Sequence, residues 1–372
     1  MITTTQTISS TYGASSSSIR SYSSVTTLVS RPHATAKVSL SLDSPDYADE
    51  GVGRINSASK LTQPSDACCE SRIPHAQPLS LLPGWLGGSG HAPKLRHYSE
   101  VPRYLQDNDF IHTGYRSGYT YKQSWASFFR LHNESGNVWT HSVAFCIFFS
   151  SIFLMATSQI HPAATVTDKI VIGLFLLCGS CTFLFSSLFH LHLCISESAY
   201  AFWGCLDYSG ISALVCGTTA TVAYYLFYCN PVIRTAWIAT LVVVNMVGVL
   251  GPRLKVWSTS AFRVYRTLVY ISSGVLSGGP VVHYCILNGI NLSLSDLNAT
   301  WFYAGSVGLY LTGAVFYVLR FPERALPGKF DLLLHSHQIW HVFVMTAAYV
   351  SFQGLLHLME WRLNQGVCPA RS

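Results

Sequence analysis

Seven long apolar stretches constrain the fold of this chain more than any other feature of its sequence. They cover residues 139–157, 169–194, 200–227, 232–250, 264–287, 300–319 and 338–358. At about 1.5 Å per helical residue, each is long enough to cross a hydrocarbon core of about 30 Å. Only 11% of the 372 residues are charged, against roughly a quarter in soluble domains. The sequence therefore predicts an all-α fold, a seven-transmembrane helix bundle.

The chain before these stretches has two different parts. Residues 1–95 are rich in Ser and Thr, which supply 17 of the first 30 residues, and this composition predicts a disordered cytosolic tail. We expect no cleavable signal peptide, because no apolar run follows a basic start. Residues 96–138 mix aromatic with basic side chains, among them Trp125 and Lys122. This mixture predicts a short interfacial helix in the lipid headgroup layer.

The positions of Lys and Arg predict the orientation of the membrane domain, residues 139–360, because basic loops stay on the cytosolic side during insertion. The N-terminal side carries most of them: Arg116, Lys122, Arg130, Arg253, Lys255, Arg263, Arg320, Arg324 and Lys329. The other side carries only Lys169, Arg234, Arg362 and Arg371. We predict a cytosolic N-terminus and an extracellular or lumenal C-terminal tail, residues 361–372, in the plasma membrane or the endoplasmic reticulum. The sequons Asn291-Leu-Ser and Asn298-Ala-Thr fall in a loop that this topology places outside, which agrees with it.

Two features of the composition suggest functions that the rest of the sequence does not support. The net charge of +6 is spread through the tail and loops, so we expect no nucleic-acid partner. Cys178 and Cys181 form a CxxC inside an apolar stretch, with no second pair to complete a redox or zinc site. We interpret these two as packing residues, together with the other cysteines in or beside apolar stretches: Cys146, Cys194, Cys205, Cys216 and Cys285.

A pair of histidines begins the last apolar stretch. His337 and His341 form an HxxxH, and this spacing puts both imidazoles on one helix face about 6 Å apart. Two such nitrogens can bind one metal ion. The alternative is that the two rings simply face lipid headgroups at the interface.

Other polar residues lie at the same predicted depth. His190 ends the second stretch and Asp207 lies near the start of the third, so the topology brings both to the cytosolic level of His337 and His341. Three imidazoles with an open fourth position form the coordination pattern of a catalytic Zn²⁺, so we predict that His190, His337 and His341 bind zinc. Asp207 is either a member of this site or a buried carboxylate satisfied by hydroxyls. Ser186 lies one turn before His190 and shares its face, with an ordinary bond to its own helix as the alternative.

Two further histidines lie near this set but on other faces. His192 and His335 are each two residues from a predicted ligand, which on a helix is about 200° away. We interpret them as packing or interfacial groups.

Four stretches make the chain resemble the progestin and adiponectin receptor family, and more distantly the hemolysin III proteins, with a tail similar to the fungal branch. They are Leu105-Gln-Asp-Asn-Asp with Gly114-Tyr-Arg, Asn133-Glu-Ser-Gly-Asn-Val-Trp-Thr-His141, Ser186-Ser-Leu-Phe-His190 with Leu206-Asp-Tyr-Ser-Gly210, and Phe321-Pro-Glu-Arg through Pro327-Gly-Lys-Phe to Ser336-His-Gln-Ile-Trp-His341. Together they span about residues 102–360, all of the predicted membrane domain.

The resemblance implies roles for single residues. Zn²⁺ is implied on the histidines of the SxxxH and HxxxH motifs, here His190, His337 and His341. The aspartate, here Asp207, is implied to hold the water of the site, and Ser186 is implied to line it. The first motif contributes Glu134, Asn137 and His141, for which the family implies a more structural role.

Three functions follow as hypotheses. In the first, the protein hydrolyses the amide of a ceramide-like lipid, as the family's ceramidase-type activity suggests. Zinc activates a water, Asp207 orients and deprotonates this water, and Ser186 positions the oxyanion. In the second, the protein is a receptor with structural zinc, and an extracellular ligand changes helix packing. The Gly-rich segment 272–280 would allow a kink for such motion, or simply close packing. Zinc transport is the third and is disfavoured, because the polar residues cluster at one depth.

Overall fold

The computed structural model of the chain describes residues 93–289 and 294–368. The predicted tail, residues 1–95, lies outside this part except for its last three residues, and the sequon residue Asn291 lies outside it as well. The described residues form helices joined by short turns and contain no strand, only an isolated bridge between Arg96 and Tyr115. The prediction of an all-α fold is therefore confirmed for this part of the chain.

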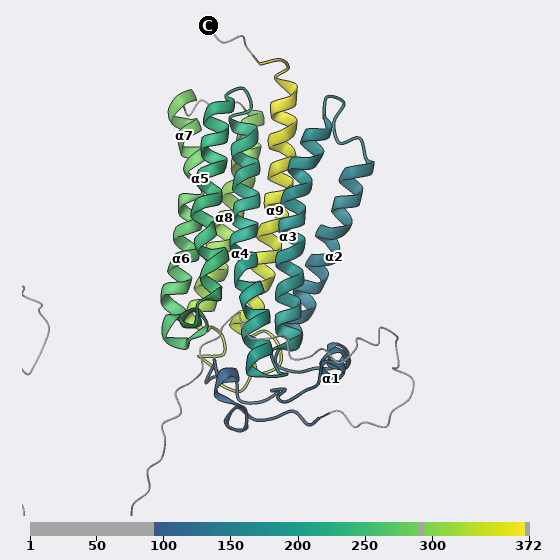
Figure 1. Ribbon diagram of the computed structural model, residues 1–372, viewed down its shortest axis with the longest axis vertical. Coiled ribbons are helices and arrows are strands. Elements are labelled where there is room, and N and C mark those ends of the chain that lie inside the picture. Colours follow the sequence, from purple (N-terminus) through teal and green to yellow (C-terminus); the bar gives the residue numbers. More distant parts are fainter. Residues whose placement is uncertain (1–92, 290–293, 369–372) are drawn as a thin grey trace, which may run out of the picture. The chain divides into compact units, whose positions relative to one another are not determined.

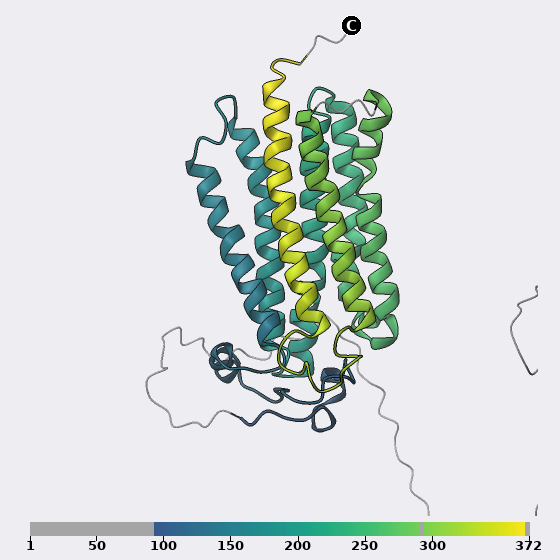
Figure 2. The same cartoon turned by 180° about the vertical axis from the view of Figure 1, so that it is seen from behind.

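Long helices run side by side in the bundle (Figures 1 and 2). Their bounds are α2 Ser135–Thr157, α3 Val166–His192, α4 Glu197–Leu226, α5 Pro231–Leu250, α6 Arg263–Leu276, α7 Gly279–Asn288, α8 Leu294–Leu319 and α9 Ser336–Asn364. Both views show α7 continuing α6 along the side of the bundle beside α5. The fifth apolar stretch, predicted as one helix, is thus two helices separated at Ser277 and Gly278.

Five helical segments among the described residues are long and apolar enough to cross a membrane: Ser135–Thr157, Val166–His192, Pro231–Arg253, Trp301–Leu319 and Ser336–Asn364. The prediction of membrane-spanning helices is confirmed for these five. The helix α4 is long, with 30 residues, but several hydroxyl side chains and Asp207 reduce its hydropathy. The helices α6 and α7, with 14 and 10 residues, are each shorter than the roughly 20 residues that a span needs.

Local sequence signals explain where several helices begin. Thr165 caps α3 in a capping box with Asp168, whose carboxylate accepts hydrogen bonds from the backbone N–H and hydroxyl of Thr165. Ser196 caps α4, and Asn230 caps α5 just before Pro231, which suits the first turn of a helix. These capping residues lie at the ends of the apolar stretches. The limits of the stretches therefore predicted most helix ends.

Aromatic side chains form the core where α2, α3 and α9 meet. Phe148 contacts Phe175 and Phe183, with ring centroids 5.9 and 5.1 Å apart, and Phe352 lies 6.1 Å from Phe175. Other large apolar side chains face outward, such as Val243 and Val275, each 70% exposed. Because lipid is as apolar as these rings, close packing rather than removal from water stabilises the core.

Small residues bring α3 and α4 into close contact. A Cβ at Gly210 would lie 3.0 Å from Cα of Thr182, and the Thr182 hydroxyl donates to the Gly210 carbonyl at 2.8 Å. The two helices are antiparallel. One turn further along α3 from Thr182, Ser186 therefore lies beside Asp207, which precedes Gly210 by three residues.

Residues 93–134 cover the end of the bundle where α3 ends and α9 begins (Figure 1). They contain α1 (Tyr121–Ala126) and short 3-10 turns, so the segment predicted as interfacial does contain a helix, which is six residues long. Trp125 and Phe129 are 53% and 87% exposed. Their contact with the headgroup layer stays a prediction.

A disulfide at the opposite end joins Cys229, after α4, to Cys368, after α9. The sequence analysis did not anticipate it. The cysteines interpreted as packing residues are all free thiols in the structure.

Candidate metal centre

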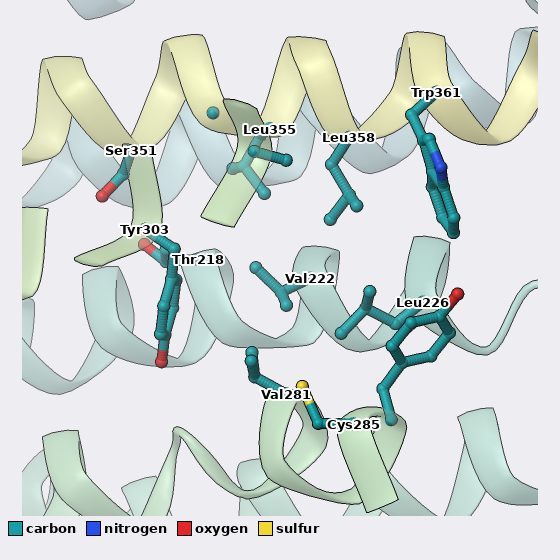
Figure 3. A pocket seen from close by; sticks show the side chains of 13 residues that line it. Thr218, Val222, Leu226, Val281, Cys285, Tyr303, Ser351, Leu355, Leu358 and Trp361 are labelled. Carbon is teal, nitrogen blue, oxygen red and sulfur yellow. The ribbon is translucent and has the colours of Figure 1, made fainter. Parts of the chain in front are cut away.

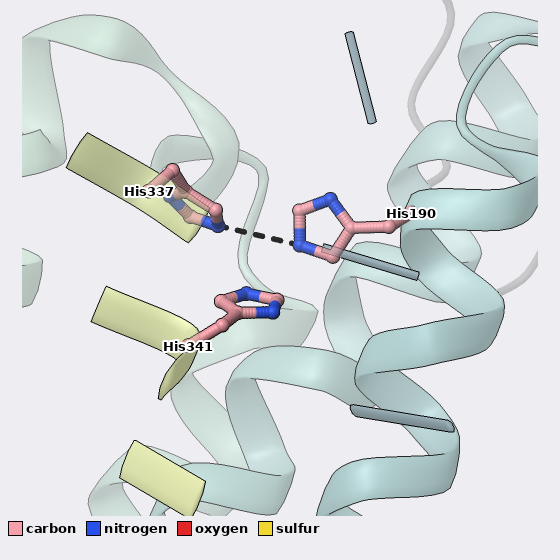
Figure 4. A group of neighbouring side chains, drawn as sticks. All are labelled: His190, His337 and His341. Carbon is pink, nitrogen blue, oxygen red and sulfur yellow. Dashed lines mark hydrogen bonds between the residues drawn. The ribbon is translucent and has the colours of Figure 1, made fainter. Parts of the chain in front are cut away.

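Three histidines from two helices converge at the end of the bundle that residues 93–134 cover (Figure 4). His190 comes from the last turn of α3, and His337 and His341 come from the first two turns of α9. Their ring centroids are 4.8 to 5.0 Å apart, and one nitrogen of each ring lies within 4.8 Å of the others. The structure thus brings together the three residues predicted as zinc ligands.

Buried polar residues fix the position of His190. The guanidinium of Arg116, itself 2% exposed, donates to the carbonyls of His190 at 2.7 Å and Leu191 at 3.0 Å. These carbonyls lie at the end of α3 and have no partner within the helix, so a cation is favoured there. Arg116 thereby holds the last turn of α3 in place.

Glu134, the residue before α2, fixes the ring of His190. Its Oε2 lies 2.8 Å from Nδ1 of His190 and 2.6 Å from the Nδ2 of Asn137. Burial acts to raise the pKa of Glu134, but the hydrogen bonds from His190 and Asn137 contribute to an opposite shift that leaves this pKa below its usual range. An ionised Glu134 accepts the Nδ1 proton of His190, which leaves the Nε2 lone pair of His190 free.

A second buried carboxylate sets the start of α9. Glu323, in the loop before this helix, is fully buried and accepts hydrogen bonds from the backbone N–H and the hydroxyl of Ser336. It also accepts from the amide of Asn108 at 3.1 Å. Because Ser336 immediately precedes His337, this contact positions the HxxxH motif.

The ring of His341 is held by α2. Its Nδ1 lies 3.2 Å from the carbonyl oxygen of Asn137, so Nδ1 carries the proton and Nε2 keeps its lone pair. The ring of His141 stacks on it, with centroids 3.7 Å apart and planes 9° apart. This stacking accounts for the structural role that the family resemblance implied for His141.

The spacing of the nitrogens fits a metal ion. Nε2 of His190 lies 3.3 Å from Nε2 of His337, as the dashed line in Figure 4 shows. Two nitrogens each about 2.05 Å from a tetrahedral Zn²⁺ lie about 3.35 Å apart. The donor set is also suitable, since neutral imidazoles suit zinc and other transition metals. The three histidines could therefore hold such an ion without moving far.

Asp207 and Ser186 lie next to this cluster. Ser186, which is 2% exposed, lies beside Asp207, whose carboxylate interacts with the Ser186 hydroxyl and with His190. Asp207 and His337 are half-buried, whereas His190 and His341 are buried. All five predicted site residues therefore occupy one region, although Asp207 does not belong to the group of possible metal ligands.

The neighbouring histidines have other partners. His192 is enclosed by the rings of Tyr121, Trp125 and Trp203 and contacts the Ser124 hydroxyl at 3.0 Å. His335 lies 2.9 Å, through Nε2, from the carbonyl oxygen of Asn133. Neither points into the cluster, as their predicted helix faces indicated.

Two residues that support the ligands were not predicted to do so. Glu134 was given only a structural role, and Arg116 counted among the basic residues of the cytosolic side and in the Gly114-Tyr-Arg stretch of the family resemblance, without a role of its own. Glu134 could have been found from its position in the sequence, because it is a lone carboxylate at the predicted cytosolic end of a span, at the depth of the three histidines. Arg116 had no comparable signal, because its partners are backbone carbonyls 74 and 75 residues away.

Comparison with known proteins agrees with these observations. The profile of the haemolysin-III-related family matches residues 129–352. The adiponectin receptor protein of Drosophila melanogaster is 35% identical over 279 residues, which are 74% of this chain and 62% of that protein. Heptahelical transmembrane protein 1 of Arabidopsis thaliana is 33% identical, over 73% of this chain and 83% of that protein. The ADIPOR-like receptor IZH2 of Saccharomyces cerevisiae is 30% identical, over 72% of this chain and 84% of that protein.

The family match covers more than half of the chain and includes every residue of the histidine cluster. The chain spans 62% and 64% of the length of its fruit-fly and nematode relatives, so similarity to them concerns the membrane domain. On the evidence of the family match and the five apolar spans, the chain belongs to the haemolysin-III-related family, with adiponectin and progestin receptors among its relatives, and is a multi-pass integral membrane protein.

Proposed function

We propose that this protein is a zinc-dependent membrane hydrolase that cleaves the amide bond of ceramide-like lipids and so acts in lipid and zinc homeostasis. The observation that carries the proposal is the 3.3 Å separation of two imidazole nitrogens beside a carboxylate–hydroxyl pair. A transition metal, an acid–base group and a polar hydroxyl at one level are what hydrolysis of an acyl bond requires. The same arrangement at a membrane interface favours a lipid substrate.

The membrane topology is part of this proposal. With α4 as a further span and the pair α6–α7 as another, the bundle has seven spans. The cover formed by residues 93–134 and the C-terminal end of α9 lie at opposite ends of the bundle (Figure 2), which an odd number of spans requires. Structural disulfides persist in oxidising compartments, and Cys229–Cys368 lies at the C-terminal end. We therefore place the C-terminus outside the cytosol and the histidine cluster at the cytosolic leaflet, in the plasma membrane or the endoplasmic reticulum.

His190, His337 and His341 would hold the ion. Bound Zn²⁺ supplies a Lewis acid that acidifies water and polarises a carbonyl. The protein's share is to aim the rings inward, which the bond to Glu134 supports for His190 and the bond to the Asn137 carbonyl supports for His341.

Asp207 is the proposed general base. Asp207 and His337 are the half-buried members of the site, so the Asp207 carboxylate could accept a proton from a water beside them. The neighbouring hydroxyl of Ser186 would orient this carboxylate. When the amide nitrogen leaves, the same carboxyl group can return the proton to it, since one group can act as base and then as acid.

An apolar pocket lies between α4, α7, α8 and α9 (Figure 3). Its cavity volume is about 70 Å³, smaller than a small-molecule site, so an acyl chain would enter it only if these helices moved apart. The pocket begins near Thr218 and Ser351 and ends near Leu226 and Trp361. Ser351 is ten residues beyond His341, or about 15 Å along the helix, so a chain lying in the pocket would have its polar end toward the metal centre.

The test is release of fatty acid from a panel of ceramides by purified protein, with Asp207→Asn and Asp207→Ala as variants. We expect wild-type turnover and a loss of about 100-fold or more in both variants, with zinc content unchanged. Unchanged release in the variants would show that Asp207 is not the base. A metal-loaded wild-type protein that releases no fatty acid would overturn the hydrolase proposal.

A receptor with structural zinc is the second candidate. The names of relatives as receptors and the interruption between α6 and α7 favour it, since a broken helix can move at its break. Under this alternative, an extracellular ligand would bind to protein that holds zinc without turnover.

A further inference from the structure

A buried arginine lies against both sulfurs of the disulfide. Nη2 of Arg362 is 2.9 Å from Sγ of Cys229 and 2.9 Å from Sγ of Cys368. Arg362 is 4% exposed, and its guanidinium also stacks on the ring of Tyr228 at 4.5 Å. The two cysteines differ in accessibility, because Cys229 is exposed and Cys368 is half-buried.

The disulfide joins the ends of α4 and α9 beside the outer end of the apolar pocket. Leu226 lines the pocket at the end of α4, three residues before Cys229, and Trp361 lines it next to Arg362. Figure 3 shows Leu226 and Trp361 at the same end of the pocket. The cross-link therefore holds together the ends of α4 and α9, which form two of the pocket walls.

We propose that Cys229–Cys368 is a thiol–disulfide exchange site through which small-molecule thiols outside the cytosol open the outer end of this pocket. The inference rests on the proposed orientation and on the pocket, and it does not depend on hydrolysis.

The exchange has two steps. The thiolate of a small thiol attacks Sγ of the exposed Cys229, the Cys229–Cys368 bond breaks, and Cys368 leaves as a thiolate. A second small thiolate attacks the outer sulfur of the mixed disulfide, releasing Cys229 as a thiolate and a small-molecule disulfide. Two electrons pass from the two small thiols to the protein pair, and both cysteine thiolates then take protons from water.

The position of Arg362 favours the first step. A leaving thiolate departs faster when a neighbouring cation stabilises it, and Arg362 already touches Cys368. Exchange at this site should therefore be faster than at a disulfide without a cation. Once the bond is broken, the chain after α9 is no longer tied to the α4–α5 loop, and the ends of the two helices can separate.

Cys285 offers a reporter of opening, because it lines the pocket, is a free thiol and is half-buried. We would measure by mass spectrometry how fast a maleimide alkylates Cys285 in detergent-solubilised protein, comparing wild type with the Cys229→Ser/Cys368→Ser variant. We expect Cys285 to react at least about fivefold faster in the variant, while Cys146, exposed on α2, reacts at the same rate in both. Equal rates at Cys285 would overturn the pocket-opening role.

The exchange step has its own test. Glutathione is added to wild type, Arg362→Gln and Arg362→Lys, and formation of free Cys368 is followed over time. We expect exchange about tenfold slower in Arg362→Gln and close to wild type in Arg362→Lys, which keeps the cation. Equal rates in all three would exclude the role of Arg362.

If the serine double variant does not fold, wild type reduced with glutathione replaces it in the alkylation experiment. Because neither readout needs metal or turnover, failure here is distinguishable from failure of the hydrolase proposal.

Discussion

The Oε2 atom of Glu134 lies 2.8 Å from Nδ1 of His190, and this contact joins the start of α2 to the end of α3. A carboxylate that accepts the outer N–H of a ligand histidine fixes its tautomer and increases its basicity. Glu134 thus prepares His190 to bind a metal without touching the ion itself.

The first prediction concerns this contact. Glu134→Gln keeps the size of the side chain but removes its charge, so zinc affinity should fall about 10- to 100-fold. Competition with a chelator of known affinity measures the change. Glu360→Gln is the matched control, because Glu360 has a side chain that is 56% exposed and lies near the other end of the bundle. Equal affinities in the two variants would exclude the role of Glu134.

The second prediction concerns the end of α3. Arg116→Ala leaves the carbonyls of His190 and Leu191 without their charged donor, which should lower the free energy of unfolding by about 3 kcal/mol or more. Thermal unfolding of the solubilised protein gives the comparison. Arg130→Ala removes a guanidinium from an exposed residue and should leave the midpoint nearly unchanged. The account of α3 would be wrong if the two variants unfolded at the same temperature.

The third prediction is a pH dependence. Burial, and next the charge of Arg116, lower the pKa of His132 to about 3, although Glu134 opposes this shift. The unfolded chain has the ordinary pKa of about 6.5. Between these two values the unfolded state binds a proton that the folded state does not, so the free energy of unfolding falls as the pH decreases.

His132→Asn removes this titration while keeping an acceptor near the Glu134 N–H, which His132 Nδ1 meets at 3.0 Å. From about pH 7 to about pH 5, wild type should therefore lose more stability than the variant, as measured by denaturant unfolding at each pH. All other titratable groups are the same in both proteins, so the difference between them isolates His132. Parallel curves would contradict the prediction.

The fourth prediction separates Ser186 from ordinary packing hydroxyls. Ser186→Ala should lower the rate of amide hydrolysis at least about tenfold without changing zinc content, because Asp207 loses the partner that orients it. Ser180→Ala is the control on the same helix, since the Ser180 hydroxyl is equally buried and bonds only the Leu176 carbonyl. Loss of activity in both variants would point to a general effect on α3.

The sequence predicted the convergence of the three histidines because depth in a membrane can be inferred from apolar stretches. His190, His337 and His341 lie at span ends that charge placement puts on one side, and their convergence followed from this. The same reasoning could not find the contacts of Arg116 and Glu323, which lie in connecting segments and meet residues far away in the sequence, such as His190 and Asn108. Such contacts depend on how the segments pack, which has no period in the sequence.

Two further features show the same limit. The break between α6 and α7 occurs where glycines and a proline interrupt an apolar stretch, so a kink was foreseeable but two separate helices were not. The disulfide joins cysteines 139 residues apart, and the predicted topology placed both on the outer side. Their pairing became visible only when the ends of α4 and α9 were seen together.

Metal analysis of the purified protein tests the central claim most directly. Inductively coupled plasma mass spectrometry should find about one zinc per chain in wild type and far less in His337→Ala, while the outward-facing His357→Ala, at the other end of α9 and 44% exposed, keeps its metal. Well-folded, monodisperse wild type that carries no metal, even after purification with added zinc, would contradict the account.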